Sequence, residues 1–493
     1  MSAARTARPM LREGETCVRV ARADRAALLI DMACYFDAAK TAMQKAHRSI
    51  HFLNWAFEHD TQFHPEPGGG GKPDDQIGNF LKALAAAKPE LDIRILCWKS
   101  AMPVAATQRF FPIGDRSAFV GTPVKFVLDG KLPLGACHHQ KMLVIDDALA
   151  FCGGGDIGPD RWDTPEHLDD NPRREKTRRD NRCFDSRHEV MAIVDGDAAK
   201  ALGQIFRDRW LRCTGETLEP REGRTPAWPR AVTPDFRGIQ VGLSRTSPRW
   251  RKYPEVREVE TLHLEAIEAA RRVIYMENQY FTSPVIAAAL ARRLRGRNPP
   301  EVVLISTEHA PSYFDQATMD KTRSNFIERL AKADHAGRFR MYSPVTTLGL
   351  TIIVHAKLTI VDDVLLRVGS ANINNRSMGF DTECDLSIEA GDDSAAQARI
   401  AALRLRLLSH WLGCADEVLA SAIEAEGGLI GGLEALRTHG YARLRPIKPE
   451  PMNPVSAVVA QYHLGDPVGP SDSWRPWLRR RALERQLAKL SRS

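Results

Sequence analysis

Two short segments of this chain carry the same reactive residues at the same spacing. They read HHQKMLVIDDALAFCGGG and VHAKLTIVDDVLLRVGSAN, and each contains the pattern H-x-K-x-x-x-x-D. The residues are His139, Lys141 and Asp146 in the first segment and His355, Lys357 and Asp362 in the second. Every residue of the second set follows its counterpart at one constant interval, so the chain contains an internal duplication.

In each copy the histidine and the lysine stand two positions apart, just before a continuous apolar run. Such a run is typical of a strand buried on both faces, and side chains two positions apart on a strand project from the same face. One imidazole and one ammonium would therefore point into the same small volume. The ammonium can bind the oxygens of a phosphate ester, and the imidazole can act as nucleophile or proton donor near neutral pH.

The chemistry also explains why two copies are needed. Displacement at phosphorus is in line, so the attacking group and the group that protonates the leaving oxygen must lie on opposite sides of the phosphate. One strand cannot supply both groups. Two homologous halves that face each other across a pseudo-two-fold axis can, with the reaction divided into formation and breakdown of a phosphohistidine.

The elements that would position these residues are duplicated as well. Helical patterns over residues 35–46 and 260–271 lead into the alternating segments SIHFLNWAF and VIYMENQYF. In both halves a further helix and strand follow, DIRILCW in the first and EVVLIS in the second. Strands that alternate with helices indicate an α/β fold. We predict two homologous α/β/α sandwich halves related by a pseudo-two-fold, with the active site at their interface.

A segment rich in proline, glycine and charge separates the halves, as is typical of a linker. The predicted organisation has four parts: a first half at residues 1–213, a linker at 214–237, a second half at 238–445 and a basic C-terminal tail at 446–493. The tail combines tryptophans and leucines at helical spacing with a basic opposite face. This pattern suits either an anionic membrane surface or docking of a terminal helix on its own domain.

The paired motifs resemble the two HKD motifs of the phospholipase D superfamily. The segments GGGDIGPDRWDTPEH, IYMENQYF and SANINNRSMGFDTECDL further resemble the eukaryotic-like phospholipase D branch as found in bacteria. The resemblance covers most of residues 30–415. It implies that His139 attacks phosphorus and that His355 protonates the leaving alcohol. Lys141 and Lys357 would hold the phosphate.

The resemblance also implies roles for residues around the motifs. Glu189 and Glu383 lie at family positions where a carboxylate orients an imidazole, although the sequence does not reveal which acid serves which histidine. Asn372 and Ser370 are expected to bind substrate. The first copy has Asp156 at the place of Asn372, where a carboxylate would repel a phosphate. The two motif aspartates, Asp146 and Asp362, are expected to support the local fold.

Composition narrows the class of protein. The net charge of +7 suits an anionic partner, and nine cysteines without paired spacing favour a reducing compartment over a disulfide framework. The N-terminus lacks a signal-peptide core, and no apolar run is long enough to span a bilayer. We therefore expect a cytoplasmic protein, soluble or bound to a membrane peripherally, with export by a route that reads no cleavable signal left open.

The predicted function is phospholipase D activity. The enzyme would hydrolyse glycerophospholipids at a membrane surface to phosphatidate and a headgroup alcohol, and would transfer the phosphatidyl group to an alcohol that competes with water. Three alternatives stay open: a cardiolipin synthase-like phosphatidyltransferase, a nuclease of the same superfamily and a non-catalytic lipid-binding scaffold. A monomer is expected because one chain holds both motifs, and no nucleic-acid partner is expected.

No metal or cofactor is predicted for this reaction. Two lysines and two histidines already supply charge neutralisation and proton transfer. The remaining histidines and the cysteines form no recognisable metal-ligand spacing. Three of these histidines are interpreted as structural or solvated: His138, His188 and His263.

Overall fold

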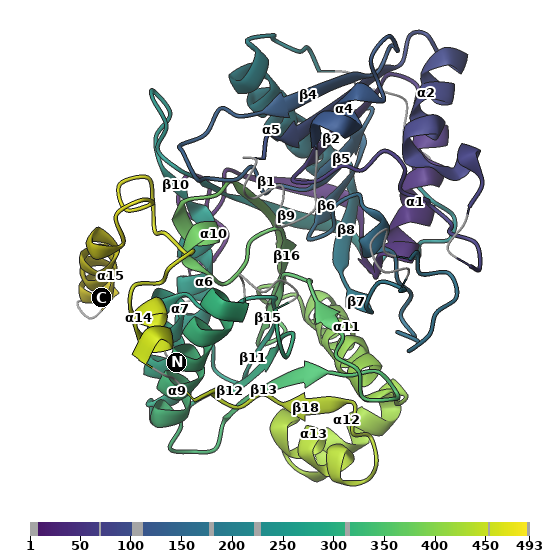
Figure 1. The fold of residues 1–493 in the computed structure, drawn as a ribbon. Helices are drawn as coiled ribbons and strands as arrows, with labels where there is room; N and C mark the ends of the chain where they lie inside the picture. Colours follow the sequence, from purple (N-terminus) through teal and green to yellow (C-terminus); the bar gives the residue numbers. More distant parts are fainter. Residues whose placement is uncertain are drawn as a thin grey trace, which may run out of the picture.

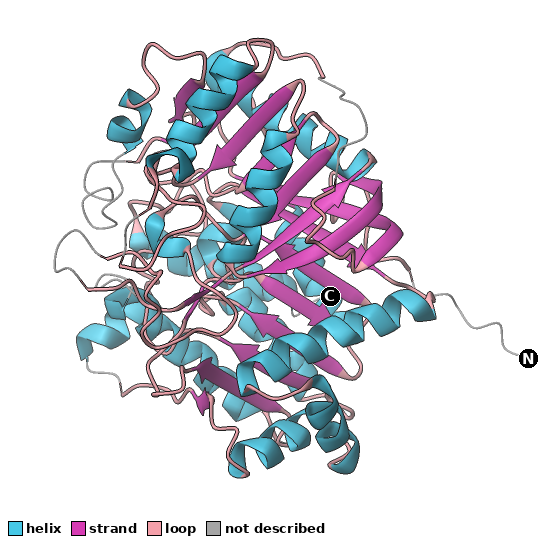
Figure 2. Ribbon diagram, turned by 90° about the vertical axis from the view of Figure 1, so that its right-hand side faces the viewer, coloured by secondary structure: helices cyan, strands magenta, loops and turns pink. Residues whose placement is uncertain are grey.

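Most strands of the described residues join in one continuous sheet (Figure 1). This computed structural model describes residues 8–68, 71–100, 112–176, 182–220, 228–310, 316–451 and 454–490. Within these ranges the sheet has sixteen strands and is mixed, and helices cover both of its faces (Figure 2). The predicted α/β class is confirmed.

The order of the strands is mirrored about the antiparallel pair β1 (Arg19–Ile30) and β9 (Phe236–Ser247). Outward from β1 come β8 (Val190–Asp195), β6 (Leu149–Gly153), β5 (Met142–Ile145), β2 (Ser49–Asn54), β3 (Asp92–Trp98) and β4 (Lys125–Asp129). Outward from β9 come β17 (Glu383–Glu389), β16 (Leu365–Gly369), β15 (Leu358–Val361), β11 (Val273–Glu277), β12 (Glu301–Ile305), β13 (Phe339–Pro344) and the added edge strand β18 (Leu444–Pro446). This is the order that a pseudo-two-fold axis between β1 and β9 produces. We call the part on the β1 side the first unit and the part on the β9 side the second unit.

The direction of the strands is mirrored too. In each unit the three outer strands are parallel, β2–β3–β4 in the first and β11–β12–β13 in the second. The inner pairs are antiparallel in both units. Consequently β5 and β15, which follow the two HxK motifs, occupy equivalent places on the two sides of the axis.

Helices cover the two faces in different ways. On one face, α5 (Asp197–Thr214) and α11 (Ser394–Leu412) contribute to a single apolar core that runs through both units. On the other face each unit has its own core. The helices there are α1 (Met32–Gln44) and α2 (Ile77–Ala87) in the first unit, and α6 (Glu258–Ala269), α7 (Pro284–Leu294) and α9 (Lys321–Ala333) in the second. The shared core ties the units into one body.

Short elements complete the fold, and one pair of them crosses between the units. Strand β7 (Arg187–His188) pairs in parallel with β14 (Ile353–Val354), just before the second HxK motif. The others are β10 (Val256–Arg257), α4 (Pro112–Ser117), α10 (Asn375–Gly379), the 3-10 helices η1 (Pro73–Asp75) and η2 (Pro159–Arg161), and the π-helix η3 (Gln316–Asp320).

The C-terminal region is helical and docks on the second unit. It contains α12 (Asp416–Ala425), α13 (Leu429–Thr438), α14 (Pro454–Gln461) and α15 (Pro476–Leu490). Helix α15 lies against α7, where Arg292 donates to the carbonyl of Leu490 at 2.7 Å and Leu483 is buried. Trp474 and Trp477 stay exposed. None of the described helices combines the length and the apolarity that crossing a bilayer requires.

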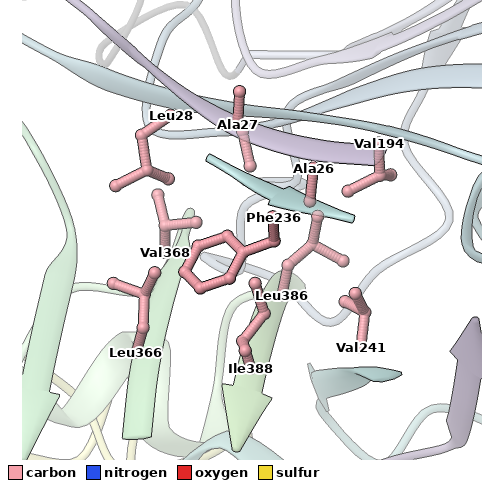
Figure 3. Close-up of a pocket in the computed structure, with 11 residues that line it drawn as sticks. Ala26, Ala27, Leu28, Val194, Phe236, Val241, Leu366, Val368, Leu386 and Ile388 are labelled. Carbon is pink, nitrogen blue, oxygen red and sulfur yellow. The ribbon is translucent and has the colours of Figure 1, made fainter. Parts of the chain in front are cut away.

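A small apolar cavity of about 20 Å³ marks the place where the units meet (Figure 3). Side chains of β1, β8 and β9 face those of β16 and β17 across it. They are Ala26, Ala27, Leu28, Ala192, Val194, Phe236, Val241, Leu366, Val368, Leu386 and Ile388. Close apolar packing therefore accompanies the β1–β9 hydrogen bonds at the junction.

Truncation of Leu243 tests how much this junction stabilises the protein. Leu243 is fully buried on β9 and lies opposite Arg19 of β1 on one side and Leu386 of β17 on the other. We expect Leu243→Ala to lower the free energy of unfolding by about 2–5 kcal/mol, because it removes buried methyl groups and leaves a cavity. Urea denaturation measures the loss. Gln240→Ala, at an exposed position of the same strand, should change stability by less than about 0.5 kcal/mol; equal losses would contradict this view of the junction.

Candidate active site

The two motif histidines are anchored on the backbone of the opposite unit. The amide of His139, just before β5, donates to the carbonyl of Thr382 at 3.1 Å. The amide of His355, in the equivalent place before β15, donates to the carbonyl of His188 at 2.8 Å. The two units therefore meet at the motifs themselves.

Each imidazole also contacts a carboxylate from the opposite unit. His139 Nδ1 lies 3.0 Å from both oxygens of Glu383, and His355 Nδ1 lies 3.0 Å from Glu189 Oε2. Both carboxylates are fully buried. A carboxylate at Nδ1 selects the tautomer that has the proton on this nitrogen and leaves Nε2 for chemistry. The structure thus shows which acid contacts which histidine, which the sequence did not reveal.

The two motif lysines are buried beside their histidines but differ in their surroundings. Lys141 Nζ donates to the carbonyl of His139 at 2.8 Å and lies 3.3 Å from Asp156 Oδ2. Lys357 Nζ donates to the carbonyl of His355. Burial lowers the pKa of Lys357 to about 7, with Glu189 opposing the change and Lys141 adding to it.

The residue that corresponds to Asn372 in the first unit is Asp156, and its carboxylate has other partners. Asp156 Oδ1 accepts from the amides of Trp55 and Ala56, both at 3.0 Å, while Oδ2 faces Lys141. Asn372 is buried, and its Oδ1 has no hydrogen-bond partner among the described residues. The duplication has thus diverged, because the first unit has an acid beside its lysine and the second unit has an amide at the corresponding position of the sequence.

Gly154 and Ser370 are also counterparts with different contacts. A Cβ on Gly154 would lie 2.9 Å from the carbonyl oxygen of His355 and 3.1 Å from Lys357 Cδ, so glycine permits the close approach of the units. The hydroxyl of Ser370 instead donates to Glu383 Oε2 at 2.5 Å and accepts from the amide of Cys384 at 3.0 Å. Ser370 therefore positions the acid that contacts His139, and its contact with substrate stays a prediction.

The motif aspartates lie away from the imidazoles and organise backbone. The carboxylate of Asp146 accepts from the amides of residues 47, 48 and 49 at 2.6–2.8 Å, at the point where the chain enters β2. Asp362 accepts in the same way from residues 271, 272 and 273 before β11. Both aspartates have φ of 54°, a left-handed conformation that Asp adopts more readily than most residues.

Arg161 is a member of the site that the sequence analysis missed. Its Nη1 lies 3.6 Å from Glu189 Oε1, and its charge lowers the pKa of His355. Arg161 belongs to the segment RWD, which served only as a family resemblance. The sequence offered one indication of Arg161: it is a basic residue within RWD, directly downstream of the first motif.

The electrostatics keep both imidazoles neutral in the free protein. Burial is the largest cause that lowers the pKa of His139 and of His355 well below 6.5, and the motif lysines of both units add to it. Burial raises the pKa of Glu383 to about 7 against the effect of Lys141, and it raises the pKa of Glu189 against the effect of Arg161. A bound anion would offset the lysine charges. It would therefore favour protonation of an imidazole when a phosphate is present.

Comparisons with known proteins find relatives among phospholipases D and cardiolipin synthases. The family model described as "Cardiolipin synthase, PLD-like domain" matches residues 263–402. Phospholipase D A of Dictyostelium discoideum is 24% identical over 463 residues, which cover 79% of this chain and 36% of that protein. A cardiolipin synthase of Geobacillus kaustophilus is 23% identical over 379 residues, which cover 74% of this chain and 62% of that protein. The chain thus covers less than two thirds of these curated relatives.

Among solved structures, the phosphatidylserine synthase of Haemophilus influenzae Rd KW20 has a similar fold. The superposition has a TM-score of 0.57 at 13% identity and covers 80% of this chain and 88% of that one. At this identity the likeness concerns the fold alone, and it extends over both units.

Sulfate binding tests the charge state of the site. As the pH falls from 7.5 to 5.5, Lys357, whose pKa burial lowers to about 7, gains a proton and so favours a bound anion. The two imidazoles, whose pKa values lie well below 6.5 in the free protein, take up a proton only when a bound anion raises those values. Because an anion raises these pKa values, sulfate should bind more tightly at lower pH, by up to about tenfold per pH unit for each proton taken up. Isothermal titration calorimetry at several pH values measures the affinity for sulfate. Lys357→Met should weaken binding and Lys332→Met, which removes an exposed lysine, should not; an affinity independent of pH would contradict the assignment.

Proposed function

Because the chain belongs to the phospholipase D superfamily, we propose that it is a phospholipase D that hydrolyses glycerophospholipids to phosphatidate and a headgroup alcohol. Superfamily membership supports an enzyme that cleaves or transfers a phosphodiester. The observation that carries the proposal is the reciprocal pairing of His139 with Glu383 and of His355 with Glu189 across the two units.

The reaction would proceed in two steps. In the first, His139 Nε2 bonds to phosphorus while the bond from phosphorus to the headgroup oxygen breaks, and His355 donates a proton to that oxygen. In the second, His355 takes a proton from water, and the water oxygen bonds to phosphorus as the bond to His139 breaks. Together the two steps return both histidines to their starting state.

The residues around the imidazoles would stabilise the charges that develop. Lys141, Lys357 and the amide of Asn372 would bind the non-bridging oxygens of the phosphate. Glu383 would stabilise the phosphorylated imidazole of His139, since a carboxylate on Nδ1 favours a positive ring. The negative charge of the phosphate would raise the pKa of His355, so that this ring takes up a proton from solvent when substrate binds.

A second candidate differs only in the acceptor. Cardiolipin synthases occur among the relatives, and the matching family model bears that description. If a lipid hydroxyl replaced water in the second step, the same site would be a phosphatidyltransferase. In either case the phosphodiester would be a phospholipid at a membrane surface.

The acceptor distinguishes these candidates. The enzyme should be incubated with vesicles of phosphatidylcholine, phosphatidylethanolamine and phosphatidylglycerol, with and without 1-butanol, and the lipids analysed by mass spectrometry. Phosphatidate without butanol and phosphatidylbutanol with it would support a phospholipase D. Cardiolipin from phosphatidylglycerol, without phosphatidate, would support the synthase. Release of neither product would contradict the proposal.

Substitution of each histidine tests the two roles. We expect His139→Asn to abolish both products without any covalent intermediate. We expect His355→Asn to slow turnover by at least about 10³-fold and, with a substrate whose leaving group needs no proton, to leave a phosphohistidine at His139. Intact-protein mass spectrometry detects this adduct. An adduct found on residue 355 in His139→Asn would reverse the roles.

The orienting acids give a separate prediction. Glu383→Gln should lower kcat by about 10²–10⁴-fold with little change in KM, because the amide selects the wrong tautomer of His139. Glu189→Gln should act likewise through His355. Steady-state kinetics with a short-chain phosphatidylcholine measure both effects. Glu268→Gln, at an exposed glutamate, is the control, and a kcat of Glu383→Gln equal to that of the control would refute the role.

A further inference from the structure

Behind the candidate active site, three histidines and one aspartate converge on a common point. They are Asp31, at the end of β1, His167, in the loop after η2, His188, in β7, and His410, in α11. One ligand atom from each residue lies within 4.8 Å of the ligand atoms of the other three. Asp31, His167 and His188 are fully buried, and His410 is half-buried.

The facing atoms of these residues lack the hydrogen bonds that buried polar atoms normally have. Four atoms have no hydrogen-bond partner among the described residues: Asp31 Oδ2, His167 Nε2, His188 Nδ1 and His410 Nε2. His167 Nε2 lies 3.6 Å from Asp31 Oδ2, and His188 Nδ1 lies 2.9 Å from Asp31 Oδ1 without the alignment of a hydrogen bond. These atoms surround one point, and the ion pairs among them involve Asp31 with His167 and with His188.

The far nitrogens of two of the rings do have partners, and both partners are carboxylates. His167 Nδ1 lies 3.0 Å from Asp163 Oδ2, and His188 Nε2 lies 2.9 Å from Glu277 Oε2. Glu277 is held in turn by Trp411 Nε1 at 2.9 Å. A carboxylate on the far nitrogen is the usual second contact of a metal-binding histidine, because it fixes the tautomer and makes the ligand nitrogen more basic.

We propose that Asp31, His167, His188 and His410 bind one zinc ion. Three imidazoles and one carboxylate are ligands that Zn²⁺ prefers, and four ligands complete its tetrahedral shell. Ligand atoms of such a shell lie about 3.3 Å apart, so small side-chain rotations suffice from the observed separations. With every position taken by protein, the ion has no place for a reactive water and is structural.

The site connects the two units at the place where the reaction would occur. Three of its ligands belong to the first unit, and His410 belongs to the second. The carbonyl of His188 accepts from the amides of His355 and Ala356 at 2.8 and 3.1 Å. Asp31 Oδ1 accepts from the amide of Glu189 at 3.1 Å. A zinc ion would thus hold the backbone that carries Glu189 against His355.

An ion network without metal explains less of the geometry. A protonated His188 between Asp31 and Glu277 would account for the contacts of its own ring. It would leave His167 Nε2 with only a long contact of 3.6 Å to Asp31 Oδ2, and His410 Nε2 without a hydrogen-bond partner among the described residues. A divalent cation accounts for all four atoms.

Metal content of the full chain, purified without a histidine tag after growth with zinc, tests the proposal. We expect about one zinc per chain by plasma mass spectrometry, and exchange for Co²⁺ should give the visible absorption of a tetrahedral site. Removal of zinc with a strong chelator should lower Tm, and added zinc should restore it. Less than about 0.1 zinc per chain after incubation with ZnCl₂, with Tm unchanged, would overturn the site.

Two variants locate the ion. His410→Gln and Asp31→Asn should each reduce zinc to less than about half an equivalent, while His439→Gln, at an exposed histidine of the same unit, should retain it. Asn has the same size and shape as Asp, so Asp31→Asn removes the charge with the smallest change to a position whose φ is 67° and ψ is 152°. Full zinc in both ligand variants would place the metal elsewhere and refute the proposal. If either variant fails to fold, the wild-type stoichiometry and Co²⁺ spectrum still decide the matter.

Discussion

The contact between an imidazole of one unit and a carboxylate of the other is the interaction on which the rest of the structure depends. Glu189 and Glu383 are fully buried, and burial raises the pKa of both. A buried acid can orient an imidazole only if the opposite unit holds the histidine and the neighbouring cations in place. The β1–β9 ladder and the shared apolar core provide that fixed placement. The contacts that stabilise the junction between the units therefore also fix the geometry of the site.

The two units share a plan but differ in the residues beside their motifs. Asp156 gives Lys141 a carboxylate partner, while the second unit has the amide of Asn372 at the corresponding position. Gly154 allows close packing where its counterpart Ser370 orients an acid. A two-step displacement needs a nucleophile on one side and a proton carrier on the other, so a perfectly symmetrical site would be no advantage. The observed divergence follows the demands of such a reaction.

The polar cluster behind the site, formed by Asp31, His167, His188 and His410, also joins residues of both units. His188 lies on β7, next to Glu189, and its carbonyl anchors the backbone of His355. Its ring meets side chains from both units. Glu189 follows β7 and His355 follows β14, while His188 within β7 is a proposed zinc ligand. A local shift in this pair of strands would move all three residues.

The sequence by itself determined the candidate reactive residues, the duplication and the α/β class, because fixed spacings and apolar alternation are local properties of a chain. Tertiary structure alone decided which acid meets which histidine, since His139 and Glu383 are 244 positions apart and His355 and Glu189 are 166 apart. It also brought Arg161 to Glu189 and assembled four ligands from distant segments. Such contacts depend on how two units pack across a sheet, and no short pattern of residues records that packing.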